Sequence, residues 1–479
     1  MEASGLWMLA CVAVLMLATG LPAWIVLTGV ALAFSLVGVT AGLFTASLLT
    51  ALSSRLVGLL ESDLLQALPL YVFMGALINR LPLADILFRA GARAFSPTGS
   101  AKPLAGLGLG VLLAPMSGSV GASVAMLTRT VHPRLEADGF APEKNLALVC
   151  MASTLGVVVP PSLVLILLGD AMMRAHTEAA NVTGLAGRII NTQDVFHGAL
   201  VPAAILLALC TAITWYVGRG SHPASEGDSP SRRVEWATAA VAVILIVSLL
   251  AAVALGYLYA VEAAATGGMA LVAYGLATRT LNSRVLMEAL RDTMAISGAL
   301  FALLVAATFF TLVQRAFGTD RWLASLFAQM GTGTFPALAI VLAALALCAL
   351  VLDAFEMIFV VIPLVVPPLL TRVPDATWVA VLVLLILQTS FLVPPFGYAI
   401  LMARGRVGKS VGTRPLARAL LPYVAAQVLV VALVIALPGI LWHESVATRP
   451  NAEAPPMSDE KMRELLGKEL LRNETEQSK

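Results

Sequence analysis

The sequence predicts an all-α polytopic membrane protein made of two inverted-topology repeats. The first observation is composition: 59% of the 479 residues are hydrophobic and 12% are charged, whereas a soluble domain carries about 25% charged residues. The second is that ten apolar segments have roughly the length of a membrane crossing. The third is that proline and small hydroxyl residues interrupt apolar segments at corresponding places in the two halves of the chain.

The apolar segments divide into crossings and candidate hairpins. Ten segments fit membrane crossings: 6–19, 22–39, 64–80, 145–168, 195–217, 236–254, 257–277, 294–313, 378–403 and 420–442. Two others, 104–130 and 335–370, contain a polar or proline break and fit re-entrant hairpins better. We therefore expect about ten transmembrane helices plus two re-entrant hairpins.

The distribution of Lys and Arg predicts the orientation in the membrane. With the N-terminus outside, the inside loops contain 18 Lys and Arg and the outside loops contain 6. Cytoplasmic loops carry the excess of positive charge in membrane proteins. The N-terminus and the C-terminal tail are thus predicted to be periplasmic, and the two hairpins open to opposite faces.

The two halves of the chain follow the same order of segments. In particular, STLGVVVPPS at 153–162 corresponds to QTSFLVPPFG at 388–397. Copies with opposite orientation are typical of transporters with inverted repeats. The predicted divisions are 1–217 (first repeat, hairpin 104–130, broken helix 145–168), 218–235 (polar linker), 236–442 (second repeat, hairpin 335–370, broken helix 378–403) and 443–479 (polar tail, with a short helical pattern at 458–472).

The two broken helices are the first candidate binding site. Backbone groups freed from a helix inside hydrocarbon cost several kcal/mol unless they line a protected cavity. Freed carbonyls together with Ser and Thr hydroxyls suit a small monovalent cation. The alternative is a proline kink that serves packing, with the hydroxyls bonded to the preceding turn. The candidates are Ser153, Thr154, Gly156 and Pro160 in the first copy and Thr389, Ser390, Pro394 and Gly397 in the second.

The hairpins supply the remaining candidates. Ser117, Gly118 and Ser119 stand at the tip of the first hairpin, where they either contribute backbone to the site or serve close helix packing.

Asp353 and Glu356 are intramembrane carboxylates, which are usually functional. They would contact a cation, orient the backbone of the second hairpin or relay a proton; the alternative is a hairpin tip close to water. Thr308 would face the same cavity or be a packed hydroxyl.

Other classes of chemistry find no support in the sequence. The five histidines fall in loops or at segment ends without metal-ligand spacing, and the four cysteines lie inside apolar runs. There is no phosphate-binding loop or nucleotide fingerprint, so ATP is not expected to drive the protein.

An ordered set of motifs resembles the large membrane subunit, of DctM type, of tripartite ATP-independent periplasmic (TRAP) transporters. The stretches that carry the resemblance are LQALPLYVFMGALINR at 65–80, SGSVGAS at 117–123, CMASTLGVVVPPSLVLILLGD at 150–170, DVFHGALVP at 194–202, VEAAATGG at 261–268, LDAFEMIFVVIPLVVPP at 352–368 and QTSFLVPPFGYAIL at 388–401. The LDxFE form of the second hairpin is similar to the branch assigned to mannitol, chloroaromatic or 2-oxo acids.

The resemblance implies sodium-driven uptake of an organic acid by an elevator mechanism in the bacterial inner membrane. It also implies a small four-helix membrane subunit (DctQ type) and a periplasmic substrate-binding protein as partners, with sodium held at the hairpin tips and helix breaks. There are two departures from the family pattern, Val393 in place of Thr and Ala306 in place of Gly, and the sequence leaves open whether they alter the second ion site or leave it to backbone groups alone.

Two rival functions stay open from the sequence. One is a stand-alone ion-coupled anion exchanger of the same architecture, which would transport without a binding protein. The other is an intramembrane enzyme that uses Asp353 and Glu356, although no second deep acid accompanies them. The sequence leaves the substrate, the sodium stoichiometry, a contribution of protons and the oligomeric state open.

Overall fold

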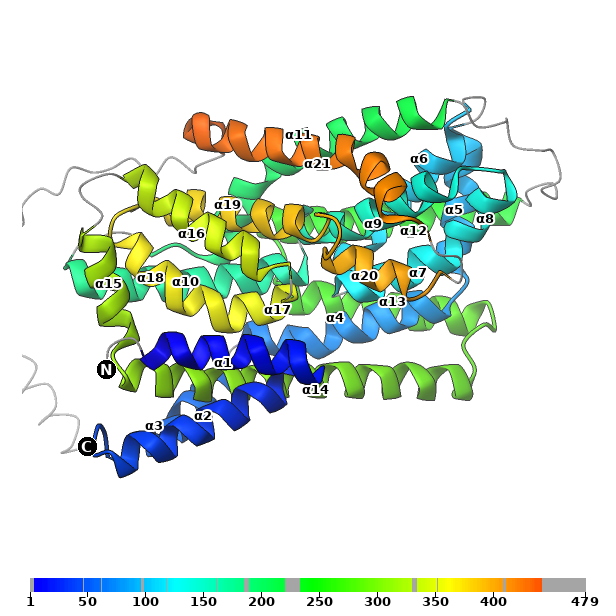
Figure 1. Ribbon diagram of the computed structural model, residues 1–479. Helices are drawn as coiled ribbons and strands as arrows, with labels where there is room; N and C mark the ends of the chain where they lie inside the picture. Colours follow the sequence, from blue (N-terminus) through cyan, green and yellow to red (C-terminus); the bar gives the residue numbers. More distant parts are fainter. Residues whose placement is uncertain are drawn as a thin grey trace, which may run out of the picture. The chain divides into compact units, whose positions relative to one another are not determined.

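The computed structural model confirms an all-helical chain (Figure 1), with no β-strand among the residues that it describes. The described residues are 4–45, 47–61, 63–95, 99–117, 119–160, 162–184, 189–219, 233–329, 334–350, 352–407 and 411–441. The polar tail with its expected helix at 458–472, and most of the polar linker, lie outside these ranges.

The first half of the chain contains the following helices: α1 (Ser4–Thr19), α2 (Ala23–Thr40), α3 (Ser47–Leu60), α4 (Asp63–Arg80), α5 (Leu83–Ala94), α6 (Ala101–Leu113), η1 (Pro115–Ser117), α7 (Val120–Thr130), α8 (His132–Ala137), α9 (Pro142–Val158), α10 (Leu163–Thr183) and α11 (Thr192–Gly218).

The second half contains these helices: α12 (Arg233–Ala254), α13 (Ala260–Ala277), α14 (Ser283–Ala316), α15 (Thr319–Gln329), α16 (Thr334–Cys348), α17 (Ala354–Glu356), the π-helix η2 (Met357–Val361), α18 (Ile362–Leu370), α19 (Ala376–Ser390), α20 (Tyr398–Arg404), α21 (Thr413–Ala436) and η3 (Pro438–Ile440).

Several helices begin where a short polar side chain accepts a hydrogen bond from the first turn. Asn191 accepts from the Asp194 amide at 2.9 Å, and Asp194 accepts in return from the Asn191 amide. Asn282 caps α14 through the Val285 amide at 2.8 Å, and Asp375 caps α19 through the Trp378 amide at 2.8 Å. These starts follow from local sequence.

Eight of the ten predicted crossings correspond to membrane-length helical units. Six described helices are long and apolar enough to span a membrane by themselves, and two bent helix pairs, α3 with α4 and α9 with α10, raise the number to eight. The remaining two predicted crossings are α1, which has 16 residues, and the α19–α20 segment, whose helices have 15 and 7 residues.

Two predicted boundaries were wrong. The crossing predicted at 294–313 is part of the 34-residue helix α14, because no proline interrupts Ser283–Ala316. The crossing predicted to end at residue 168 continues in α10 to Thr183, where Gly184 ends the helix in the left-handed conformation.

Each predicted hairpin consists of helices that pack against each other. In the first, α6 contacts α7 across η1; in the second, α16 contacts α18 across α17 and η2. Figure 1 shows α6 and α7 on the right-hand side and α16 and α18 on the left-hand side. The faces to which the hairpins open, and the two inverted repeats, stay predictions.

The helices pack in two groups that meet along η1, α10 and η2. In one group α14 lies against α2 and α4, and α4 lies against α13. In the other, α9 packs against α6, α7, α20 and α21, and α10 packs against α18. The groups touch where η1 and α10 contact α4 and where η2 contacts α14.

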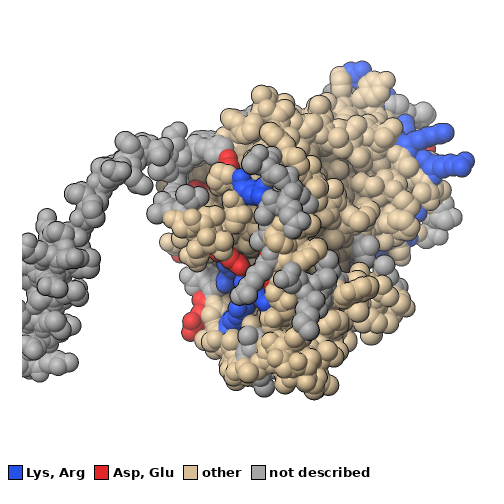
Figure 2. All heavy atoms as spheres, turned by 60° about the vertical axis from the view of Figure 1, so that its left-hand side comes forward, with Lys and Arg blue, Asp and Glu red and all other residues tan. Residues whose placement is uncertain are grey.

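The outer helix surfaces are apolar, as the hydrocarbon of a bilayer requires. Leu36 of α2, Ile244 of α12 and Leu347 of α16 are 68%, 68% and 69% exposed. Figure 2 shows a surface that is largely uncharged, with the Lys and Arg side chains gathered in a few places.

The close approach of α6 to α9 generates a stability prediction. A Cβ on Gly110 would lie 2.5 Å from the Ala152 carbonyl oxygen, whereas a Cβ on Gly108 of the same helix meets nothing within 4 Å. We expect Gly110→Ala to lower the free energy of unfolding by about 1–3 kcal/mol, the usual cost of overpacking. Gly108→Ala is the matched control and should be neutral or stabilising. Thermal unfolding in detergent measures both, and equal melting temperatures would contradict the packing.

Candidate functional site

The first helix break separates α9 from α10 at residues 159–162. The two helices are bent by 42° at this point. The Ser162 hydroxyl donates to the Val157 carbonyl at 3.1 Å and accepts from the Leu165 amide at 3.1 Å. One serine therefore closes the end of α9 and caps the start of α10, and Pro160 lies buried between them.

A small cavity lies between this break and the tip of the first hairpin. Its volume is about 10 Å³, close to that of a single water-sized probe. Its walls come from both segments: Ala114, Pro115, Ser119, Val120, Ser123, Ser153, Gly156, Val157, Leu163 and Val164.

Two of the three serine hydroxyls in this cavity, those of Ser123 and Ser153, are oriented as oxygen ligands rather than as donors. Ser153 donates its proton to the Cys150 carbonyl at 2.8 Å, and Ser123 donates to the Ser119 carbonyl at 3.1 Å. A hydroxyl that donates to a backbone carbonyl still has lone pairs available. Such oxygens suit a monovalent cation better than an anion. Thr154 donates to the Met151 carbonyl and does not line the cavity.

Gly156 determines how closely the hairpin approaches the break. A Cβ at this position would lie 2.5 Å from the carbonyl carbon of Ala114 and 2.7 Å from its oxygen. Only glycine therefore brings the end of α6 and the end of α9 into direct contact.

The second break lies between α19 and α20 and is closed by its own backbone. The Gly397 amide donates to the Val393 carbonyl at 2.9 Å, and the Ala399 amide donates to the Phe391 carbonyl at 3.2 Å. A Cβ on Gly397 would lie 2.5 Å from the Phe391 oxygen, so the turn depends on glycine. The Thr389 hydroxyl donates to the Leu385 carbonyl at 2.7 Å.

The remaining candidates at this break differ in exposure. Ser390 is buried and Pro394 is half-buried.

Asp353 and Glu356 form a capping box at the tip of the second hairpin. Asp353 accepts from the Phe355 amide at 2.6 Å, and Glu356 accepts from the Asp353 amide at 3.1 Å. Of the three roles expected for these carboxylates, orientation of the hairpin backbone is the one that the geometry provides.

The two hairpins and the two breaks converge. The Tyr398 hydroxyl lies 3.5 Å from the place that a Cβ on Gly121 would take, so α20 touches the first hairpin. The Cys150 thiol contacts the Ala399 carbonyl at 3.7 Å, and Asp353 and Glu356 are electrostatic neighbours of Tyr398.

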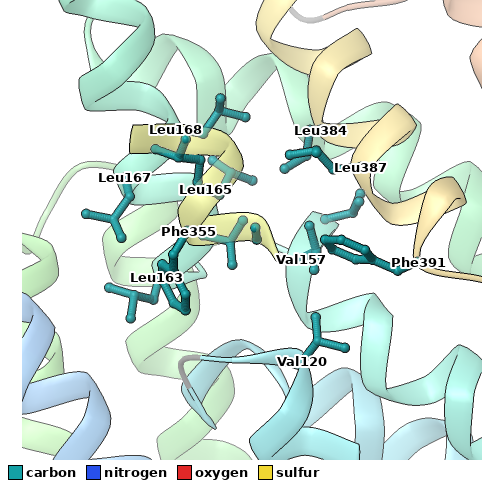
Figure 3. Close-up of a cluster of buried hydrophobic side chains, with 14 of the residues drawn as sticks. Val120, Val157, Leu163, Leu165, Leu167, Leu168, Phe355, Leu384, Leu387 and Phe391 are labelled. Carbon is teal, nitrogen blue, oxygen red and sulfur yellow. The ribbon is translucent and has the colours of Figure 1, made fainter. Parts of the chain in front are cut away.

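Figure 3 shows the shared apolar cluster beneath these contacts. It contains Val120 from the first hairpin, Val157 from the first break, Phe355 from the second hairpin and Phe391 from the second break. One core therefore joins all four predicted elements.

One predicted residue, Thr308, is placed differently, and two others are not described in full. Thr308 lines a separate, larger cavity beside Ile358 and Phe359, not the small one, and its hydroxyl donates to the Leu304 carbonyl. The Ser117 side chain and Gly118 lie outside the described part of the chain.

The predicted site residues did not include Tyr398, although it directly follows the PPFG motif. This position beside PPFG could have identified Tyr398 as a candidate site residue from the sequence. Ser123 belongs to the SGSVGAS stretch at 117–123 of the first hairpin, and its spacing of four from Ser119 indicates a shared helix face.

A comparison with protein families identifies the chain. The model of the family described as the tripartite ATP-independent periplasmic transporter, DctM component, matches residues 9–440. The chain belongs to this family. The DctM family consists of transporter components, not enzymes, and its tripartite systems contain two further proteins.

Curated relatives of this DctM-family chain are distant in sequence. The C4-dicarboxylate TRAP transporter large permease protein DctM of Rhodobacter capsulatus is 22% identical over 80% of this chain and 86% of its own length. The isethionate TRAP transporter permease protein DctMQ of Oleidesulfovibrio alaskensis is 22% identical over 80% of this chain, which spans only 58% of that protein. The sialic acid permease SiaT of Haemophilus influenzae is 22% identical, and the match covers 62% of its length.

Two solved transporters share the fold. The YdaH transporter of Alcanivorax borkumensis superposes with a TM-score of 0.60 at 18% identity, over 83% of this chain and 89% of that one. MtrF of Neisseria gonorrhoeae has a TM-score of 0.53 at 14% identity, over 84% of both chains. These likenesses support the helical membrane architecture of a DctM-family protein.

Two variants of Asp353 separate its role as a helix cap from the effect of its charge. Asp353→Ala should lower the free energy of unfolding by about 1 kcal/mol, because it removes the acceptor for the Phe355 amide. Asp353→Asn keeps an acceptor and should retain the stability. Thermal unfolding of the two variants tests this; equal losses would show that the charge, not the cap, matters for folding.

Proposed function

We propose that this DctM-family chain is the membrane subunit that performs sodium-coupled uptake of a carboxylic acid delivered by a periplasmic binding protein. The observation that carries the proposal is the cavity of about 10 Å³ between the first hairpin and the first break. Its size admits a single small ion or water, and its polar groups are hydroxyl and backbone oxygens.

The cavity favours sodium over protons as the coupling ion. No wall residue is titratable near neutral pH, since the polar members are serines. A proton relay there would have no group to carry the proton. A sodium ion would link the hairpin to the broken helix and place a positive charge close to the substrate.

Movement of the hairpins and breaks against the remaining helices is the mechanism that we propose. The hairpins, the breaks and the apolar cluster of Figure 3 would move as one unit, while α2, α4, α13 and α14 would form the fixed scaffold. We propose a small four-helix subunit of DctQ type as partner on the scaffold side, and the bacterial inner membrane as the location. The N-terminus and tail would be periplasmic. The fused DctMQ relative supports such a pairing.

The test of uptake uses this chain, its small membrane subunit and its binding protein in liposomes. Uptake of carboxylic acids should require both an inward sodium gradient and the binding protein. Uptake without the binding protein would instead support a stand-alone exchanger. Uptake driven by a pH gradient and indifferent to sodium would contradict the proposed coupling ion.

The sodium site makes a separate prediction. Ser153→Ala removes one oxygen from the cavity, and we expect the half-saturating sodium concentration to rise about tenfold, since a bond to a charged group contributes about 1.5 kcal/mol or more. The matched control is Ser35→Ala, because the buried Ser35 hydroxyl also donates within its own helix, to the Ala31 carbonyl, but lies on α2. An equal effect of both changes on sodium dependence would contradict the site.

A further inference from the structure

The larger cavity, of about 450 Å³, lies between the two helix groups. Helices α3, α4 and α14 form one side, and α10, η2 and α18 form the other. Its volume falls within the range of small-molecule sites. No residue predicted from the sequence except Thr308 lines it.

The walls of this cavity combine apolar surface with a few charges. Leu304, Ile358, Phe359 and Pro363 supply apolar surface. The charged members are three arginines and two carboxylates: Arg55, Arg174, Arg315, Asp170 and Glu178. On the face drawn in Figure 2, blue and red side chains likewise stand together within a largely uncharged surface.

Two of the three arginines are already paired. Arg174 donates to Asp170 at 2.9 Å, and Arg315 donates to Glu178 at 2.7 Å. Arg315 also lies 4.0 Å from Asp320, which is not part of the cavity wall. These pairs leave little positive charge for a ligand.

Arg55 is the exception. Among the residues that the structure describes, no carboxylate lies within ion-pair distance of Arg55, although Arg315, Glu178 and Asp320 act on it at longer range. A guanidinium binds a carboxylate through two parallel hydrogen bonds. Arg55 can therefore hold one carboxylate.

A second carboxylate would find no unpaired donor on the α14 wall, because Arg315 of this helix is paired with Glu178. The hydroxyls of Thr308 and Thr311 donate their protons to the carbonyls of Leu304 and Ala307 at 2.8 and 2.9 Å. Their remaining lone pairs repel an anion. The surroundings of Ile358 and Phe359 are apolar and suit a hydrocarbon or aromatic group.

We propose that this cavity binds a monocarboxylate with an apolar body, with the carboxylate at Arg55 and the body against Ile358 and Phe359. The inference rests on the proposed function, because it assigns the cavity to the transported acid. It narrows that acid to a class: one negative charge and a bulky apolar group.

The test is equilibrium binding to the purified complex of this chain with its small membrane subunit, using four matched probes. Phenylacetate should bind at least about tenfold more tightly than acetate, which lacks the apolar body. It should also bind at least about tenfold more tightly than phenylacetamide, which lacks the charge. Phenylsuccinate, a diacid with the same ring, should bind about tenfold more weakly than phenylacetate. Tighter binding of phenylsuccinate or phenylacetamide would overturn the proposal.

Arg55→Gln should raise the Kd for phenylacetate at least about tenfold, and Arg55→Lys should raise it less, because the charge remains but the paired donors are lost. Arg284→Gln is the charge-matched control, since Arg284 is 87% exposed and lies outside the cavity walls. An unchanged Kd in Arg55→Gln, or an equal loss in Arg284→Gln, would overturn the role of Arg55.

A second variant tests the apolar body without touching a charge. Gly58 lines the cavity, and a Cβ there meets nothing within 4 Å, so Gly58→Leu fills space without a backbone clash. This change should raise the Kd for phenylacetate about tenfold and change the Kd for acetate by no more than about twofold. Gly29→Leu on α2, where a Cβ also meets nothing within 4 Å, is the control and should change neither ligand. Equal weakening of both acids by Gly58→Leu would contradict the proposed placement.

Binding and uptake separate this inference from the proposed function. If uptake is driven by sodium but Arg55→Gln binds phenylacetate as the unchanged protein does, the proposed carboxylate site is wrong and the proposed function stands. Binding that depends on Arg55, in a complex whose uptake ignores sodium, would overturn the coupling and leave the cavity as a carboxylate site.

Discussion

Backbone polar groups at a broken helix must find partners inside the membrane, and the architecture around both breaks follows from this requirement. At the first break, the Ser162 hydroxyl closes α9 and caps α10. At the second, the amides of Gly397 and Ala399 return to carbonyls of the same turn. The breaks are thus stable local structures whose side-chain oxygens remain available to a ligand.

Close packing then brings these local structures to one place. Gly156 lets α9 reach the end of α6, and the Tyr398 hydroxyl lies beside Gly121. The apolar cluster beneath them includes residues of both hairpins and both breaks. Packed side chains therefore connect the two hairpins.

The two cavities differ in chemistry as well as in size. Serine oxygens line the small cavity at the first break, whereas arginines and apolar side chains line the larger one. The small cavity suits a cation and the large one a carboxylate with an apolar group.

The sequence by itself determined the helical membrane class, the family and most segment positions. Those features depend on local apolar length, on proline and glycine, and on caps such as Asn282 and Asp375. It also indicated both breaks, but it misplaced the end of α10 and the start of α14. Only the tertiary structure grouped Arg55, Arg174 and Arg315, because they come from three helices distant in sequence. Likewise, only packing separated Thr308 from the serine cavity, since the direction of a helix face depends on its neighbours.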